Sequence, residues 1–184
     1  MTYSICEARR RFYLWAAYRA AQAGSVKATG KDFYHALKEC GVIKYLEGQA
    51  LSPVNAKTYD KKFHEWVKKL NKYLKSKSKH RKTVPYGVAA KLISIYAKGA
   101  FILNGYENSE LARHIHPPID SRLLKSLATD PRFTEEEQEC LRETKWTRMT
   151  KGVYYRRIEL LRKVLGGTPF WMLEEHWIPV DDEG

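Results

Sequence analysis

The sequence has little cysteine, and its few cysteines lie far apart. The 184 residues include three, Cys6, Cys40 and Cys140, whose odd number and wide spacing argue against a disulfide framework and fit a reducing compartment. There is no Cys-x-x-Cys pair of the kind that binds zinc, and three thiols cannot ligate a four-cysteine iron–sulfur cluster. The pair His114-x-His116 stands alone before a Pro-Pro turn. We therefore expect neither a metal nor another cofactor.

Long hydrophobic runs and β-type alternation are missing too. No apolar stretch approaches the roughly 20 residues that cross a bilayer, so we expect no membrane span. The segment Met1 to Glu7 reaches a charge at once and lacks the apolar core of a signal peptide, which predicts a cytoplasmic, nucleoid-associated protein. A chain of this length buries roughly 70% of its surface on folding without a disulfide or metal. We expect a single domain over residues 1–184, and a monomer.

Acidic residues are outnumbered by basic ones. Lysine and arginine total 33 against 21 aspartates and glutamates, which gives a formal charge of +12. A surplus of this size most often serves binding to a polyanion such as nucleic acid. The 12 tyrosines and 5 tryptophans add rings that can stack on bases. The alternative is a basic protein whose charge serves only its solubility.

What the sequence does contain is helical periodicity almost throughout. From Ile5 to Ala23, Phe12, Trp15, Ala16 and Arg19 recur at helical spacing. Further helices are predicted over Lys31–Cys40, Ser52 to about Lys75, Tyr86–Leu103, Ser121–Ala128, Thr134–Arg142, Met149–Leu165 and Phe170–Glu175. The second of these places one apolar face on Tyr59, Phe63, Trp66, Val67, Leu70, Tyr73 and Leu74. The pattern predicts an all-α fold, with at most two small lobes sharing a groove.

A basic stretch interrupts this pattern. Residues 75–82 read Lys-Ser-Lys-Ser-Lys-His-Arg-Lys, and residues 68–82 contain eight lysines or arginines and no acid. Such a run is usually a solvated face. It also directly precedes the most apolar helix of the chain, so it is equally a candidate surface for DNA phosphates. The residues predicted to contact phosphates there are Lys75, Lys77, Lys79, Arg81 and Lys82.

Lys91 is anomalous because charged side chains are rarely buried, yet it lies in the second turn of the apolar segment 86–103. Ser94 follows on the same helical face, and Lys98 lies two turns along, roughly 10 Å away. This stripe points either into a groove that takes anions or into a pocket where one amine is uncharged and nucleophilic. The alternative is that both lysines extend along apolar neighbours to the surface.

Asp120 is the second candidate. It follows Pro117-Pro118 and opens the helix predicted from Ser121, which makes it a strong N-cap. This capping role alone is enough to explain why an aspartate stands at this position. A carboxylate held at a helix start and kept ionised by the amide dipoles is also suited to stabilise a cation or to activate water.

Two segments, Val84–Leu92 and Pro117–Leu123, together resemble the helix-hairpin-helix DNA glycosylases, most closely the compact archaeal 8-oxoguanine DNA glycosylase type. The resemblance covers mainly residues 84–124 and implies that the hairpin and catalytic segment spans about residues 66–128. It implies that Lys91 attacks C1′ of a turned-out nucleotide and that Asp120 assists deprotonation and stabilises the sugar cation.

The resemblance further implies that the hairpin backbone holds a DNA phosphate. The residues concerned are Tyr86, Gly87, Val88 and Ala89, and Lys98 is a lesser candidate for DNA contact. One departure weakens this expectation, because Ala89 stands where the family has a second glycine. The partner implied is double-stranded DNA with a modified base, which is turned out of the stack and read in a pocket.

The base pocket is expected to draw on the aromatic and imidazole side chains near and after Asp120. The candidates are His116, Trp146, Tyr154 and Trp171, with Tyr155 and Trp177 as further members of the same cluster. The base is either oxidised guanine or a bulky modified cytosine of the phage type, so the role is either repair or antiphage defence, with or without strand cleavage. Two other functions stay open: a non-catalytic helical module that binds nucleic acid, and a helical protein that binds a protein partner.

Overall fold

Helices and turns make up the structure, a computed structural model that describes residues 3–22, 28–48, 54–77 and 83–177. Within these ranges no residue lies in a β-strand, which confirms the all-α prediction. In chain order the α-helices are α1 (Ile5–Gln22), α2 (Gly30–Cys40), α3 (Val42–Gly48), α4 (Ala56–Lys77), α5 (Tyr86–Ala100), α6 (Glu110–His114), α7 (Ser121–Leu127), α8 (Glu135–Arg142) and α9 (Lys151–Leu165). The same ranges contain the 3-10 helices η1 (Ile102–Asn104), η2 (Trp146–Arg148) and η3 (Phe170–His176).

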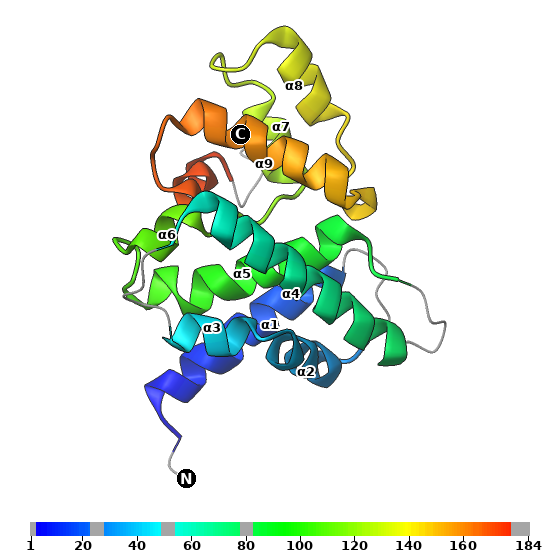
Figure 1. The fold of residues 1–184 in the computed structure, drawn as a ribbon, viewed down its shortest axis with the longest axis vertical. Coiled ribbons are helices and arrows are strands. Elements are labelled where there is room, and N and C mark those ends of the chain that lie inside the picture. Colours follow the sequence, from blue (N-terminus) through cyan, green and yellow to red (C-terminus); the bar gives the residue numbers. More distant parts are fainter. Residues whose placement is uncertain (1–2, 23–27, 49–53, 78–82, 178–184) are drawn as a thin grey trace, which may run out of the picture.

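The helices form two lobes that follow one another along the long axis of the molecule (Figure 1). The first lobe holds α1 to α5, with α1 packed on α5 and α2 packed on α4. The second lobe holds α7, α8 and α9, at the top of Figure 1. Because α5 also contacts η2 and α9, it joins the two lobes. One hydrophobic core runs through both, from Ala17 of α1 to Leu173 of η3.

α5 is the buried central helix that the apolar segment 86–103 predicts, although it ends at Ala100 and the chain continues as η1. By length and composition alone, residues 86–104 are long and apolar enough to cross a membrane, so the expectation that no segment reaches this length is wrong. Within the protein, however, 67% of that window is buried. This burial is what the core helix of a globular domain requires.

Three short helices, α3, α6 and η2, were not predicted from the sequence. Segments of three to seven residues are too short to display a helical period. The start of α4 also differs from its prediction. Asn55 accepts a hydrogen bond from the amide of Thr58 at 2.9 Å, so the helix begins at Ala56. Ser52 and Pro53, the predicted start, lie outside the described residues.

The two long helices of the first lobe differ in how well their buried faces were predicted. α4 buries all but one residue of the expected face, with Tyr59, Phe63, Trp66, Val67, Leu70 and Leu74 in the core. The exception is Tyr73, which is only partly buried. In α1, however, Phe12 and Trp15 are 58% and 57% exposed. The helix instead buries Ala17 and lays Tyr13 against Gly99 of α5. Gly99 leaves room on α5 for the ring of Tyr13, and with Tyr13 and Ala17 facing the core, Phe12 and Trp15 lie on the exposed part of α1.

A buried polar network ties the first lobe to α9. His116 is wholly buried, and its Nε2 lies 2.8 Å from Asp60 Oδ1 of α4 while its Nδ1 lies 3.0 Å from the hydroxyl of Tyr154. A neutral imidazole fits these partners, since it donates from one nitrogen and accepts at the other. Arg162 of α9 donates to both oxygens of Asp60 at 2.6 Å.

The pKa values of His116 and Asp60, two members of this network, are both lowered. Burial lowers the pKa of His116, against the raising effect of its hydrogen bond to Asp60. Burial acts to raise the pKa of Asp60, but hydrogen bonds from Arg162 and His116 prevail and lower it to about 2. Both groups therefore bind fewer protons in the folded protein than in the unfolded chain as the solution becomes acidic.

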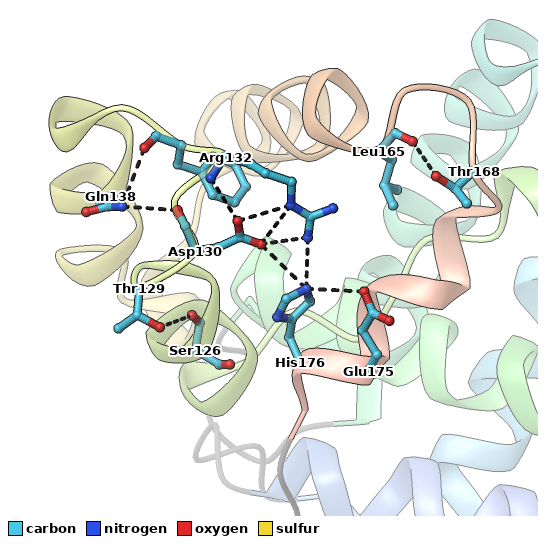
Figure 2. Close-up of polar contacts among 10 residues, drawn as sticks. Ser126, Thr129, Asp130, Arg132, Gln138, Leu165, Thr168, Glu175 and His176 are labelled. Atoms are coloured by element: carbon cyan, nitrogen blue, oxygen red, sulfur yellow. Dashed lines mark hydrogen bonds and ion pairs between the residues drawn. The ribbon is translucent and has the colours of Figure 1, made fainter.

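A second polar cluster fixes η3 against the loop that joins α7 and α8 (Figure 2). Arg132 donates from Nε to both oxygens of the buried Asp130 at 3.0 Å, and its Nη2 lies 2.6 Å from Oδ2. His176, at the end of η3, lies 3.0 Å from the same guanidinium nitrogen and 3.6 Å from the Asp130 carboxylate. Gln138 of α8 donates to the backbone carbonyl of Asp130 at 3.0 Å. These contacts determine where η3 and the residue after it, Trp177, are held.

We expect the free energy of unfolding to fall as the pH is lowered from about 7 to 5. The unfolded chain protonates its histidine near pH 6.5 while the folded protein keeps His116 neutral, and one such group contributes up to about 1.4 kcal/mol per pH unit. His116→Gln should be less stable than wild type at pH 7 and should lose part of this pH dependence. Urea unfolding of both proteins across this range is the measurement, and parallel pH curves would contradict the prediction.

Gly99→Ala should destabilise the protein by about 1–3 kcal/mol, because a Cβ at this position would lie 2.4 Å from Cδ1 of Tyr13 and force α1 away from α5. Gly152→Ala in α9 is the matched control. A Cβ there meets only Arg156 Nη1 at 3.6 Å, so the better helix propensity of alanine should make that change neutral or stabilising. Equal effects of the two substitutions in urea unfolding would show that the contact between α1 and α5 is not tight.

Candidate functional site

Lys91 lies inside the molecule on α5, and its ammonium group has two partners. Its Nζ is 2.9 Å from Oδ2 of Asp120, and both side chains are only 10% exposed. The same Nζ lies 4.4 Å from the centre of the Trp146 ring, a distance at which a cation is attracted to the ring face. The structure thus brings together the two residues that the sequence singles out, Lys91 on α5 and Asp120 directly before α7.

Asp120 is held from two sides, with a separate role for each oxygen. Its Oδ1 accepts hydrogen bonds from the amides of Arg122 and Leu123, both at 3.1 Å, so the residue caps α7 as predicted. Its Oδ2 faces Lys91 and also accepts a hydrogen bond from the indole N–H of Trp177 at 3.1 Å. The carboxylate is therefore fixed in orientation, with one oxygen directed at the amine.

A cavity of about 420 Å³ opens onto this pair. Its walls come from α1, from one face of α5, from Asp120 and from the end of η3. The α5 face consists of Lys91, Ile95, Lys98 and Gly99. The predicted stripe is therefore correct for the two lysines but not for Ser94, which is buried and does not line the cavity. The volume lies within the range of about 300–1,000 Å³ that is typical of small-molecule sites.

A second ion pair lies in the same cavity. Lys98 pairs with Glu174 of η3, and both line the cavity together with Lys91 and Asp120. Burial raises the pKa of Glu174, against the lowering effect of Lys98. The charge of Asp120 adds a smaller effect in the same direction and raises the pKa of Glu174 further. The cavity therefore combines two amines with two carboxylates.

None of the four residues predicted for the base pocket lines the cavity that holds Lys91 and Asp120. His116 and Tyr154 are 0% and 1% exposed, bond to each other in the core network, and do not line the cavity. Trp146 contacts Lys91 but also does not line the cavity. Trp171 lines a neighbouring cavity that shares Lys98 and Glu174 with the first. Trp177, a further member of the predicted aromatic cluster, does line the cavity and donates a hydrogen bond to Asp120.

The residues expected to form a phosphate-binding hairpin also differ from the prediction. The amide of Gly87 donates to the carbonyl of Met149 at 3.2 Å, and the amides of Val88 and Ala89 donate to the carbonyl of Pro85. A Cβ on Gly87 would lie 2.2 Å from the carbonyl oxygen of Trp146, so the glycine here serves a close contact with η2. These three amides are occupied within the protein and cannot hold a DNA phosphate in this structure. The Tyr86 side chain contacts Tyr155 and His64 instead.

The predicted basic surface is described only in part. Lys75 and Lys77 lie exposed in the last turn of α4, and neither lines the cavity. Lys79, Arg81 and Lys82 lie outside the described residues. Lys98, the lesser candidate for DNA contact, is the member of the predicted cationic set that shares a cavity with Lys91.

Comparisons of the chain with models of protein families, with curated proteins and with solved structures find no match. The chemistry of the cavity therefore has to be inferred from its own side chains.

Asp120→Ala should destabilise the protein more than Asp120→Asn, by about 1 kcal/mol, since asparagine retains the N-cap whereas alanine loses it. Ser109→Ala, which removes the capping hydroxyl of α6, is the matched control for the loss of a cap without a neighbouring ion pair. Thermal or urea unfolding of the three variants is the measurement. Equal stability of the two Asp120 variants would mean that the cap on α7 contributes nothing.

Proposed function

We propose that this protein is a DNA glycosylase that removes a modified base by attack of Lys91 on C1′ of the target nucleotide. The observation that carries the proposal is the Lys91–Asp120 pair, with 2.9 Å between Nζ and Oδ2, at the wall of a cavity in a chain of charge +12. An amine and a fixed carboxylate, each only 10% exposed, are the groups that nucleophilic displacement at a sugar carbon needs.

The reaction follows from the positions of these two groups. A proton leaves Nζ of Lys91 for Oδ2 of Asp120, and the free electron pair of the amine then forms a bond to C1′. The glycosidic bond breaks, and its electron pair leaves with the base, which takes up the proton held by Asp120. The nitrogen then gives a second proton to Asp120, which passes it to O4′ as the C1′–O4′ bond breaks and the sugar ring opens. The nitrogen lone pair forms the double bond of a protonated Schiff base between Lys91 and C1′, from which strand cleavage or hydrolysis can follow.

Asp120 contributes in a second way, because positive charge develops on the sugar as the base departs. Its Oδ1 is already held by two amides of α7, so the carboxylate need not reorganise when this charge appears. Trp177 donates to Oδ2 and closes one side of the cavity. The base itself must first leave its stack to reach the pair, because the glycosidic bond is not accessible within stacked DNA.

The substrate that fits this proposal is DNA with a modified base, either oxidised guanine or a bulky modified cytosine. The cavity offers an ammonium donor at Lys98 and a carboxylate acceptor at Glu174 to the edge of such a base. Neither the volume nor these groups select between the two bases, so repair and antiphage defence both remain compatible roles.

A non-catalytic nucleic-acid-binding module is the second candidate. The observation that favours it is the ion pair itself, because a partly buried lysine needs a carboxylate partner whether or not it reacts. A pure binder predicts that Lys91→Ala weakens DNA binding no more than Lys77→Ala does. It also predicts that wild type and both variants leave the bases and strands of the bound DNA intact.

Borohydride trapping tests the enzymatic proposal. Wild-type protein is incubated with oligonucleotides that carry oxidised guanine or modified cytosine, and reduction of the Schiff base should leave a covalent adduct. Lys91→Ala should abolish the adduct, and Asp120→Asn should reduce turnover at least about 100-fold while DNA binding is retained. Lys125→Ala, on the exposed face of α7, is the surface control and should form the adduct.

Two outcomes would count against the assignment. An adduct that persists in Lys91→Ala but disappears in Lys98→Met would move the nucleophile to the other amine of the cavity. If no oligonucleotide with oxidised guanine or modified cytosine gives an adduct, and none is cleaved when alkali is added afterwards, the result would favour the binding module.

A further inference from the structure

Two aromatic side chains on α1 lie exposed to solvent and in contact with each other. The rings of Phe12 and Trp15 have centroids 5.9 Å apart with 32° between their planes, and the two residues are 58% and 57% exposed. Single exposed apolar residues are common, but adjoining ones of this size point to a binding surface. We call these two residues the α1 aromatic pair.

The α1 aromatic pair stands at the mouth of the cavity that holds Lys91 and Asp120. Phe12 lines that cavity, and Trp15 contacts Phe12 without lining the cavity itself. Trp177, which is 37% exposed, and the exposed Leu103 also line it. The opening therefore has an apolar and largely aromatic border, while the interior carries the charged groups.

The charge of α1 indicates which ligand this border takes. The helix carries four arginines, at positions 9, 10, 11 and 19, against the single acid Glu7. Arg11 and Arg19 lie one turn before and one turn after Trp15, on the same side of the helix. Alternating cations and aromatic rings are what proteins use to hold a phosphate backbone while its bases stack on the rings.

The hydrogen-bonded amides at the start of α5 indicate whether the bound DNA is single-stranded or a duplex. Gly87, Val88 and Ala89 donate to carbonyls of the protein, so the backbone there does not grip a duplex phosphate. A stacking surface such as the α1 aromatic pair needs bases whose faces are free, and these occur in single-stranded or unpaired DNA rather than within a duplex.

We propose that Phe12 and Trp15 form a stacking platform for unpaired bases next to the target nucleotide, and that the site takes its target from single-stranded or locally unpaired DNA. This inference rests on the proposed function because it takes DNA as the partner. It adds that the bound DNA is single-stranded or locally unpaired. Stacking on Phe12 positions the neighbouring nucleotide at the mouth, which leaves the target free to enter the cavity.

The test compares binding of an undamaged, labelled single strand with binding of the same sequence as a duplex, by fluorescence anisotropy at one salt concentration. Wild type should bind the single strand more tightly. The double variant Phe12→Ala, Trp15→Ala should weaken single-strand binding about tenfold or more, with little change for the duplex. Trp15→Phe, which keeps a ring, should retain most of the affinity.

Two controls separate stacking from general effects. Ile5→Ala removes an apolar side chain of α1 that is 67% exposed and does not line the cavity, so it should leave both affinities unchanged. Lys125→Ala should affect single strand and duplex alike if it affects either. Circular dichroism and urea unfolding check that the double variant folds, which is expected because both rings are already exposed in wild type.

Three results would overturn the proposal. Equal affinity of wild type for single strand and duplex is the first, and equal weakening of both by the double variant is the second. The third is unchanged DNA binding in the double variant together with loss of a dimer in size-exclusion chromatography, which would make the pair an interface between two copies of this chain.

Borohydride trapping on the same two DNA forms, each with a modified base, keeps the two proposals apart. Preferential single-strand binding without any adduct supports the platform and contradicts the glycosylase. Equal trapping on both forms that does not change in the double variant supports the glycosylase and contradicts the platform. Absence of DNA binding in any form contradicts both.

Discussion

The requirement that a lysine on the central helix find a carboxylate shapes much of this structure. An amine taken out of water is costly unless an opposite charge and hydrogen bonds compensate it. Lys91 meets that requirement with Asp120, which can serve only because it is at the same time the cap of α7. The second lobe is thereby placed so that its first helix points its N-terminus toward α5, and the cavity forms where α1 and η3 close over the contact.

Much of the fold could be predicted from the sequence. Helices longer than about two turns show their period, and one buried face, that of α4, was predicted almost residue by residue. The pair Lys91 and Asp120 was also found, because a lysine in an apolar helix and an aspartate after Pro117-Pro118 are local signals. α1 was harder to predict, since its buried face is decided by Gly99 on another helix, which no pattern within α1 reveals.

The walls of the cavity were mostly beyond prediction, for a physical reason. His116 and Tyr154 resemble ligand-binding residues in the sequence, but they satisfy each other and Asp60 in the core. Glu174 carries no distinguishing signal in the sequence, and Trp177 was predicted only as a further member of the aromatic cluster. They reach Lys98 and Asp120 because Arg132 and His176 fix η3 through Asp130 (Figure 2). Such placement depends on long-range contacts, and the chain's local periodicity does not encode it.

The cavity draws its walls from α1, from α5 and from the end of η3, which are remote along the chain and meet only after both lobes have docked. A chain that lacks α1 or η3 would leave the amine and the carboxylate open to bulk water. The sheltered environment of the Lys91–Asp120 pair is therefore a property of the complete fold, and no single segment of the chain provides it.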